Sequence, residues 1–221
     1  MSFVALETST RRPSVAVRAA GRTLVRTLES ERAHASDLVP ALDALLGELG
    51  ETPSSIEGVL VGTGPGSYTG LRVGIATARG LASSTGALLR GVPSGETIVF
   101  ERLEPGQYGV HLLDARGGEL SFALYERLAQ EVRVESAPRA VSPEELAELL
   151  PQQVPIFGEQ GVAEAAGLSP AQRELLCGDS PAGAETLLTL GRARLDTLGG
   201  QAAHEVEPLY LRPFAAKARR R

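Results

Sequence analysis

The sequence predicts an α/β protein made of two related lobes, and three observations support this fold class. Apolar alternation and turn residues indicate three strands over residues 3–9, 14–20 and 22–29. An apolar strand that ends in an acid, seen first at residues 3–7, returns at residues 109–114. The chain has 221 residues, 43% of them hydrophobic, which is enough for a sizeable packed core.

The first half continues with a helix, a strand and a second helix. Residues 36–49 place leucines at the spacing of a single apolar stripe, with Ser36 as the expected N-cap and Pro40 tightening or kinking the first turn. The short apolar run at residues 58–62 is typical of a buried strand. A glycine-rich loop then leads into a helix expected over residues 70–85. The first half therefore has the order βββαβα.

The second half repeats this order in a shorter form. Duplicated βββαβα halves are typical of the actin-like ATPase fold (ASKHA, ribonuclease H-like), in which a nucleotide lies between two lobes. We expect that fold, with an N-terminal lobe over residues 1–103 and a reduced C-terminal lobe over residues 104–221. The expected elements of the second lobe are strands over 109–114, 119–126, 130–135 and 154–158, a helix that Ser142 and Pro143 open, and a helix over 182–198.

Composition excludes several classes of protein. Cys177 is the only cysteine, which excludes an intramolecular disulfide and a multi-cysteine metal site. Lys217 is the only lysine, so neither a Walker A loop nor a protein-kinase active site can form. No run approaches the roughly 18 apolar residues of a membrane helix, and Met1 leads directly into a strand rather than a secretory signal. We therefore expect a cytoplasmic protein.

The charge balance argues against a protein that holds nucleic acid mainly by its own charge. Twenty-two basic and 27 acidic residues give a net charge of −5. The exception is the basic tail at residues 217–221, for which a solvated terminus is the simpler interpretation and an RNA-contacting arm the alternative. Aromatic residues make up 4% of the chain and are scattered, so we expect no stacking platform for RNA bases.

The most distinctive motif is a glycine-rich loop at residues 62–74, Gly-Thr-Gly-Pro-Gly-Ser-Tyr-Thr-Gly-Leu-Arg-Val-Gly. Its glycines allow a tight turn and close backbone approach, and the amides of the following helix favour an anion. A strand-to-helix connection that needs glycine only for its geometry is the simpler interpretation. Ser67 or Thr69 is expected to cap the helix. The loop residues that we single out are Gly64, Gly66, Ser67, Thr69, Gly70 and Arg72.

The helix after this loop has one face with almost no side-chain bulk. Gly70, Gly74, Ala78 and Ala82 recur at every fourth residue, which lets another element approach closely. Packing against the protein's own sheet is the commoner explanation of such a face. A subunit interface is the alternative.

The loop motif resembles the signature of the TsaB family, formerly called YeaZ. Two departures are chemically mild: Glu7 stands where the family more often has Asp, and Tyr68 where it often has Phe. The resemblance covers essentially the whole chain, because further similar stretches lie at residues 6–9 with 14–17, 32–40, 113–116 with Glu119, and 208–212.

The resemblance implies a degenerate actin-like fold and a subunit without catalytic residues or a cofactor of its own. Such a subunit pairs with a catalytic paralogue, TsaD, and the pair works with an ATPase, TsaE. Together they transfer threonylcarbamoyl from its adenylate to N6 of the adenosine beside the anticodon in tRNA. The resemblance also implies a homodimer when the partner is missing, and contact with tRNA only through the complex.

The histidines argue against metal or peptidase chemistry. His34, His111 and His204 lie far apart in the sequence, whereas a metal site needs closely spaced ligands. No serine–histidine–acid set is evident either. We therefore expect no bound transition metal and no peptidase activity.

Two groups of residues are candidate sites. We expect association through the helices at 36–49 and 70–85, with Val39 and Leu46 left for the lobe's own sheet. The alternative function is a stand-alone ATPase, or an acyl- or phosphotransferase, in which strand-end acids hold magnesium or activate water. The residues assigned to the partner interface are His34, Leu38, Leu42, Leu45, Leu71, Gly74, Ile75 and Ala78. Those assigned to a vestigial cleft are Glu7, Thr8, Ser9 and Asp114.

Overall fold

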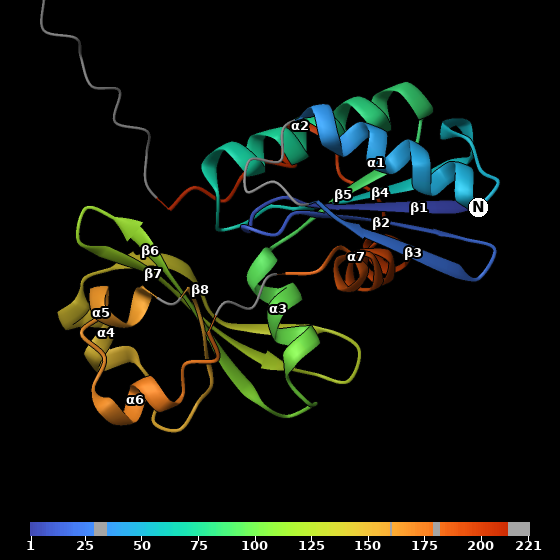
Figure 1. Ribbon diagram of the computed structural model, residues 1–221. Helices are drawn as coiled ribbons and strands as arrows, with labels where there is room; N and C mark the ends of the chain where they lie inside the picture. Colours follow the sequence, from blue (N-terminus) through green and yellow to red (C-terminus); the bar gives the residue numbers. More distant parts are fainter. Residues whose placement is uncertain (29–34, 160, 179–181, 212–221) are drawn as a thin grey trace, which may run out of the picture.

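The computed structural model describes residues 1–28, 35–159, 161–178 and 182–211 (Figure 1). Two sheets lie side by side, and helices cover both faces of each one. The first sheet has the strand order β3-β2-β1-β4-β5 and the second the order β8-β7-β6-β9. The predicted two-lobed actin-like fold is confirmed, and the second lobe is the reduced one.

The first sheet is antiparallel along one edge and parallel along the other. β1 pairs antiparallel with β2 and parallel with β4, so the chain crosses over between these two neighbours of β1. Its strands are β1 (Ser2–Glu7), β2 (Ser14–Ala19), β3 (Arg22–Thr27), β4 (Ile56–Gly62) and β5 (Leu88–Val92).

Helices cover both faces of this sheet. α1 (Ala35–Glu48) and α2 (Tyr68–Thr85) pack on one face, where their leucines, isoleucine and alanines join the valines of β1, β2 and β4 in one apolar cluster. α7 (Ala184–Leu198) packs on the other face against Ala5, Ala16 and Leu60. Helix α7 comes from the far end of the chain, yet it completes the core of the first lobe.

The second sheet repeats the pattern with shorter parts. β6 (Tyr108–Arg116), β7 (Glu119–Arg127) and β8 (Val132–Val141) form an antiparallel meander, and β9 (Ile156–Phe157) pairs parallel with β6. One face carries the short helices α4 (Pro143–Leu149), α5 (Val162–Ala165) and α6 (Pro170–Glu174), and the other carries α3 (Ser94–Arg102).

Helices α3 and α7 lie between the two sheets and link the lobes (Figure 1). Glu96 of α3 forms an ion pair with Arg194 of α7, and the Glu96 side chain is buried. Burial raises the pKa of Glu96, and the Arg194 charge opposes that rise. The pair therefore joins α3 to α7 across the region between the two sheets.

Most of the expected elements are present within a few residues of their predicted bounds, and four were not predicted. Ser142 caps α4 as expected, because its hydroxyl accepts from the Glu145 amide at 3.2 Å. The helices and strands that the sequence does not predict are β5 (Leu88–Val92), α3, α5 and α6. The sequence order places the helix at residues 182–198 in the second half, whereas α7 packs on the first sheet. The boundary between residues 103 and 104 stays a prediction.

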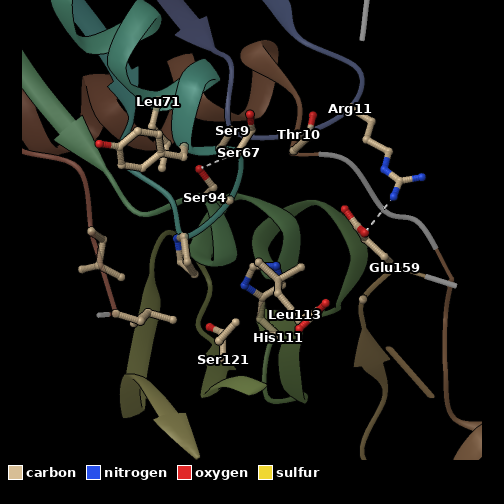
Figure 2. A pocket seen from close by; sticks show the side chains of 18 of the residues that line it. Ser9, Thr10, Arg11, Ser67, Leu71, Ser94, His111, Leu113, Ser121 and Glu159 are labelled. Carbon is tan, nitrogen blue, oxygen red and sulfur yellow. Dashed lines mark hydrogen bonds and ion pairs between the residues drawn. The ribbon is translucent and has the colours of Figure 1, made fainter. Parts of the chain in front are cut away.

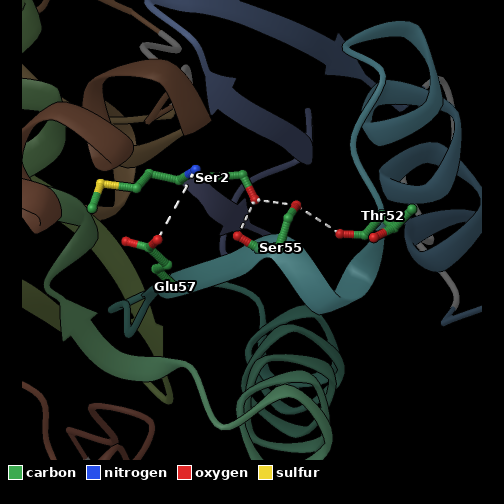
Figure 3. Close-up of polar contacts among 5 residues, drawn as sticks. Ser2, Thr52, Ser55 and Glu57 are labelled. Atoms are coloured by element: carbon green, nitrogen blue, oxygen red, sulfur yellow. Dashed lines mark hydrogen bonds and ion pairs between the residues drawn. The ribbon is translucent and has the colours of Figure 1, made fainter.

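Hydrogen bonds tie the start of the chain to the first sheet (Figure 3). The Ser2 hydroxyl donates to the Ser55 carbonyl at 2.9 Å, and the Ser55 hydroxyl donates to the Thr52 carbonyl at 2.8 Å. These bonds hold the short turn η1 (Pro53–Ser55) beside the start of β1.

Among the described residues, no helix combines the length and apolarity that crossing a membrane requires.

Candidate functional site

A pocket of about 770 Å³ opens between the two lobes (Figure 2). The first lobe contributes Ser9, Thr10 and Arg11 of the β1–β2 loop together with the start of α2. The second contributes the ends of β6 and β7 and the segment after β9. Ser9, two residues after the end of β1, and Asp114, near the end of β6, both line this pocket.

The glycine-rich loop forms one wall of the pocket and leads into α2. Ser67, rather than Thr69, caps this helix, and its hydroxyl accepts from the Gly70 amide at 3.2 Å. The Ser67 amide donates to the Ser9 carbonyl at 2.7 Å, which joins the loop to the β1–β2 turn. Gly64 has φ of 92°, a left-handed conformation that favours glycine.

Close contact with residues 8 and 9 explains the small face of α2. A Cβ at Gly66 would meet the Ser9 carbonyl oxygen, and a Cβ at Gly70 would meet that of Thr8. A Cβ at Gly74 would meet the Thr8 hydroxyl. The commoner interpretation of the face is confirmed, because it packs inside its own lobe.

The carboxylate of Glu7 is buried beneath the pocket and accepts hydrogen bonds from two residues, Ser9 and Ser94. One oxygen accepts from the Ser9 amide at 2.7 Å and the other from the Ser94 hydroxyl at 2.9 Å. The Ser94 hydroxyl in turn accepts from the Ser9 hydroxyl at 2.9 Å and from the Gly64 amide at 3.2 Å. Glu7 therefore joins the end of β1, the glycine-rich loop and the start of α3.

Burial raises the pKa of Glu7, and the hydrogen bonds from Ser9 and Ser94 offset part of that rise. A carboxyl whose folded-state pKa exceeds its unfolded value stabilises the protein most when protonated, and that contribution is lost as pH rises through the folded-state pKa. In Glu7→Gln, the free energy of unfolding should therefore fall less steeply as the pH rises above about 4.5, the ordinary pKa of a glutamate.

Urea denaturation of both proteins across a pH series measures this difference. Glu174→Gln removes one exposed carboxylate on α6 and is the matched control. Parallel pH profiles for wild type and Glu7→Gln would contradict the prediction.

The four residues assigned to a vestigial cleft do not form one cluster. Ser9 and Asp114 line the pocket, whereas Glu7 and Thr8 are buried beneath it and are not among its lining residues. The Thr8 hydroxyl donates to the Gly70 carbonyl at 2.8 Å. Asp114 is exposed and accepts from the Arg116 amide at 2.7 Å, which is the behaviour of a turn residue.

The pocket floor is polar but uncharged. His111 and Ser121 lie on adjacent strands and are 3% and 2% exposed (Figure 2). The His111 Nδ1 and the Ser121 hydroxyl are buried with no hydrogen-bond partner among the described residues. Burial lowers the pKa of His111 to about 4, so its imidazole is neutral at physiological pH.

An ion pair crosses one side of the pocket. Arg11 of the β1–β2 loop lies 3.1 Å from Glu159, which follows β9 in the second lobe (Figure 2). Both side chains are more than two-fifths exposed, so the pair contributes little to stability.

Two tyrosines and an arginine, the Tyr68–Arg72–Tyr210 cluster, form an exposed group on another side. The ring centroids of Tyr68 and Tyr210 are 5.3 Å apart, and the Arg72 guanidinium lies 4.2 Å from the Tyr68 centroid. Arg72 Nε donates to the Tyr210 hydroxyl at 2.8 Å, which raises the pKa of the guanidinium. Tyr68 and Tyr210 are far apart in the sequence and meet only in the folded chain.

The side chains assigned to a partner interface pack inside the first lobe instead. These side chains are buried, and all of them except Leu71 join the apolar cluster with β1, β2 and β4, which corrects that assignment. Leu71 is also buried but lies against the interlobe pocket. Val39, which we left for the sheet, is 51% exposed. His34 lies outside the described residues. The side chains concerned are Leu38, Leu42, Leu45, Leu71, Ile75 and Ala78, with Gly74 buried beside them.

Several residues of the site gave no signal in the sequence. Ser94 begins a helix that was not predicted, and Ser121 lies within an ordinary strand pattern. His111 was noted only as an isolated histidine, and Tyr210 only as part of the C-terminal resemblance. Among the described residues, no group of three or more histidine, cysteine, aspartate or glutamate side chains is placed to hold a metal ion.

Comparisons with known proteins agree on one family. A family model described as TsaD, tRNA N6-adenosine threonylcarbamoyltransferase, matches residues 26–172. The tRNA threonylcarbamoyladenosine biosynthesis protein TsaB of Haemophilus influenzae is 33% identical over 56% of this chain and 53% of its own length. The TsaB protein of Escherichia coli is 31% identical over 58% of this chain and 56% of its own length.

The chain thus spans about half the length of the curated relatives it matches. A solved structure, YeaZ from Pseudomonas aeruginosa, covers more. It is 27% identical, has a TM-score of 0.79, and covers 95% of this chain and 99% of its own. Because a family model described as TsaD matches more than half of the chain, the chain belongs to that family, and the curated TsaB relatives together with the YeaZ structure assign it to the TsaB (YeaZ) members.

Proposed function

We propose that this chain is a non-catalytic subunit in the biosynthesis of threonylcarbamoyladenosine in tRNA. We infer the pathway from the TsaB relatives, whose names refer to threonylcarbamoyladenosine biosynthesis in tRNA. We infer the non-catalytic role from the contacts of Glu7. Both oxygens of that carboxylate are engaged by Ser9 and Ser94, and the side chain is fully buried.

This engagement of Glu7 is the observation that carries the non-catalytic role. An acid that holds a nucleotide-bound magnesium ion must present its oxygens to the cleft. Glu7 instead presents them to its own chain, and Asp114 on the opposite side serves a turn. The end of β1 thus supports the architecture of the loop rather than chemistry in the pocket.

The proposed partners are a TsaD-like catalytic subunit and a TsaE-like ATPase. We propose that the outer surfaces of α1 and α2 meet the catalytic subunit, and that they form a homodimer when it is missing. On α1 this surface includes Val39, Pro40 and Asp43, and on α2 it includes Ala76 and Gly80. Ala76 and Gly80 carry little bulk, so a partner helix can approach closely.

Reconstitution tests the proposal. The chain is combined with its catalytic and ATPase partners, tRNA, and the threonylcarbamoyl adenylate, and threonylcarbamoyladenosine is measured by mass spectrometry of digested tRNA. We expect product only when this chain is present, and none from this chain alone. The Glu7→Gln variant should still give most of the product, because Glu7 supports the structure of the loop and takes no part in the reaction.

The alternative, a stand-alone ATPase or acyl- or phosphotransferase, has a distinct outcome in the same experiment. If the isolated chain shows robust turnover and Asp114→Ala abolishes it, the chain is an enzyme in its own right and the proposed subunit role is wrong. If the same amount of product forms when this chain is left out, the chain is not required for the modification and the proposal is wrong.

A further inference from the structure

The interlobe pocket carries polar groups on its floor and on one wall that the described chain leaves unused. We propose that it binds a small organic anion that also carries a hydroxyl group, with the negative charge at the start of α2 and the hydroxyl at Ser121. The choice of a threonine derivative within this class rests on the proposed function. The class itself rests on the geometry of the pocket.

The Ser121 hydroxyl is the group that points to a ligand. Ser121 lines the pocket and is 2% exposed, and its hydroxyl has no hydrogen-bond partner among the described residues (Figure 2). A buried polar group without a partner costs free energy that a bound ligand can recover. His111 on the adjacent strand also lines the pocket, but its Nδ1 lies beneath α3, where a Cβ at Gly95 would meet it. We therefore assign the ligand's hydroxyl to Ser121.

The start of α2 supplies the place for the negative charge. The Gly70 amide donates to the Ser67 hydroxyl at 3.2 Å, and the Leu71 amide donates to the Ser67 carbonyl at 2.9 Å. Among the described residues, no hydrogen bond engages the Thr69 amide, and Thr69 lines the pocket. Because α2 has 18 residues, the positive end of its dipole adds to this amide. An anion is therefore favoured at this wall.

The volume and the apolar lining suit a small organic molecule. The pocket holds about 770 Å³, within the range of roughly 300–1,000 Å³ that is typical of small-molecule sites. Leu71, Ile98 and Phe157 also line it, and they suit the carbon atoms of a ligand rather than a bare inorganic ion. A nucleotide bound through magnesium fits poorly, because both oxygens of Glu7 are already engaged.

The pathway that the relatives are named for narrows the class further. A threonylcarbamoyl group carries a carboxylate, a hydroxyl, a methyl group and an uncharged amide. Its carboxylate matches the start of α2, its hydroxyl matches Ser121, and its methyl group matches the apolar lining. Because its nitrogen is an uncharged amide, it needs no acid on the floor, where His111 is neutral. N-carbamoyl-L-threonine is the simplest molecule with these groups.

Isothermal titration calorimetry of the full chain with N-carbamoyl-L-threonine tests the proposal. N-carbamoyl-L-valine has a methyl group in place of the hydroxyl and should bind about tenfold more weakly. N-carbamoyl-L-threoninamide lacks the negative charge and should also bind about tenfold more weakly. Inorganic phosphate has the charge without the carbon chain and should bind more weakly than N-carbamoyl-L-threonine.

Ser121→Ala separates a ligand contact from a structural one. Since the hydroxyl has no partner in the described chain, its removal should leave the urea midpoint of the free protein unchanged or raise it. The variant should bind N-carbamoyl-L-threonine about tenfold more weakly and N-carbamoyl-L-valine as wild type does. Ser136→Ala on β8 lies outside the pocket lining and should change the binding of neither compound.

The proposal is wrong if wild type shows no saturable binding of N-carbamoyl-L-threonine, or if it binds the valine compound or phosphate equally well. A Ser121→Ala protein that is less stable than wild type would give the hydroxyl a role in the fold and also overturn the proposal. The reconstitution assay is independent of these results. Product that requires this chain, without binding of N-carbamoyl-L-threonine, would refute the ligand and leave the proposed function intact.

Discussion

Gly70→Ala should destabilise the protein by about 3 kcal/mol or more, enough to prevent folding in a marginally stable domain. A Cβ at this position would overlap the Thr8 carbonyl oxygen, which is backbone and cannot rotate away. The Thr8 hydroxyl also donates to the Gly70 carbonyl, so the two segments cannot separate without losing that bond. Urea denaturation, or soluble yield if the variant does not fold, measures the effect.

Gly80 in the same helix is the matched control. It is exposed, and a Cβ there would meet no atom within 4 Å. Gly80→Ala should therefore stabilise the protein by about 0.5–1 kcal/mol through helix propensity. Because Gly80 lies on the proposed partner surface, both variants are compared at the same oligomeric state. Equal effects of the two substitutions would contradict the packing argument.

The opposite roles of these two glycines show what the sequence can predict. The spacing of Gly70, Gly74, Ala78 and Ala82 reveals a face without bulk, and packing against the protein's own sheet was the commoner explanation. Spacing cannot identify the neighbour, because Thr8 and Ser9 are more than sixty residues away in sequence. The local pattern therefore predicts a helix face with little bulk but not which residues pack against it.

The elements that were missed lack the period on which prediction depends. In α3, residues Ser94 to Val99 are all buried, so no polar face alternates with an apolar one. β5 has only five residues and lies between two helices. By contrast, β1 to β3 show alternation, β4 a short apolar run, and α1 and α2 a clear apolar stripe or small-residue face, and their predicted bounds are close to those observed.

The site was predictable only in part. The strand-end acids and the glycine-rich loop were found, because strand ends and glycine clusters have recognisable local signatures. The partners of Glu7 were not, since Ser94 lies 87 residues further along the chain. The meeting of Tyr68 with Tyr210 likewise depends on how the C-terminal segment crosses the first lobe. Contacts of this kind arise from tertiary structure and leave no local pattern.

Leu42→Glu and Ala78→Arg should unfold the isolated chain rather than merely separate it from a partner. Leu42 is 4% exposed and Ala78 is fully buried, so each substitution places an unpaired charge in the core of the first lobe. The cost is about 4 kcal/mol or more, comparable to the stability of many whole domains. Circular dichroism and soluble yield measure the loss of structure.

Val39→Glu and Ala76→Arg are the matched surface variants on the same two helices. Both residues are exposed, so the free energy of unfolding should change by only about 0.5 kcal/mol. If α1 and α2 meet a partner, these variants should be monomeric in size-exclusion chromatography with light scattering, and should fail to co-purify with the catalytic subunit. Folded variants that still pair would move the partner surface away from these helices. Folded Leu42→Glu protein would show that this side chain is not part of the core.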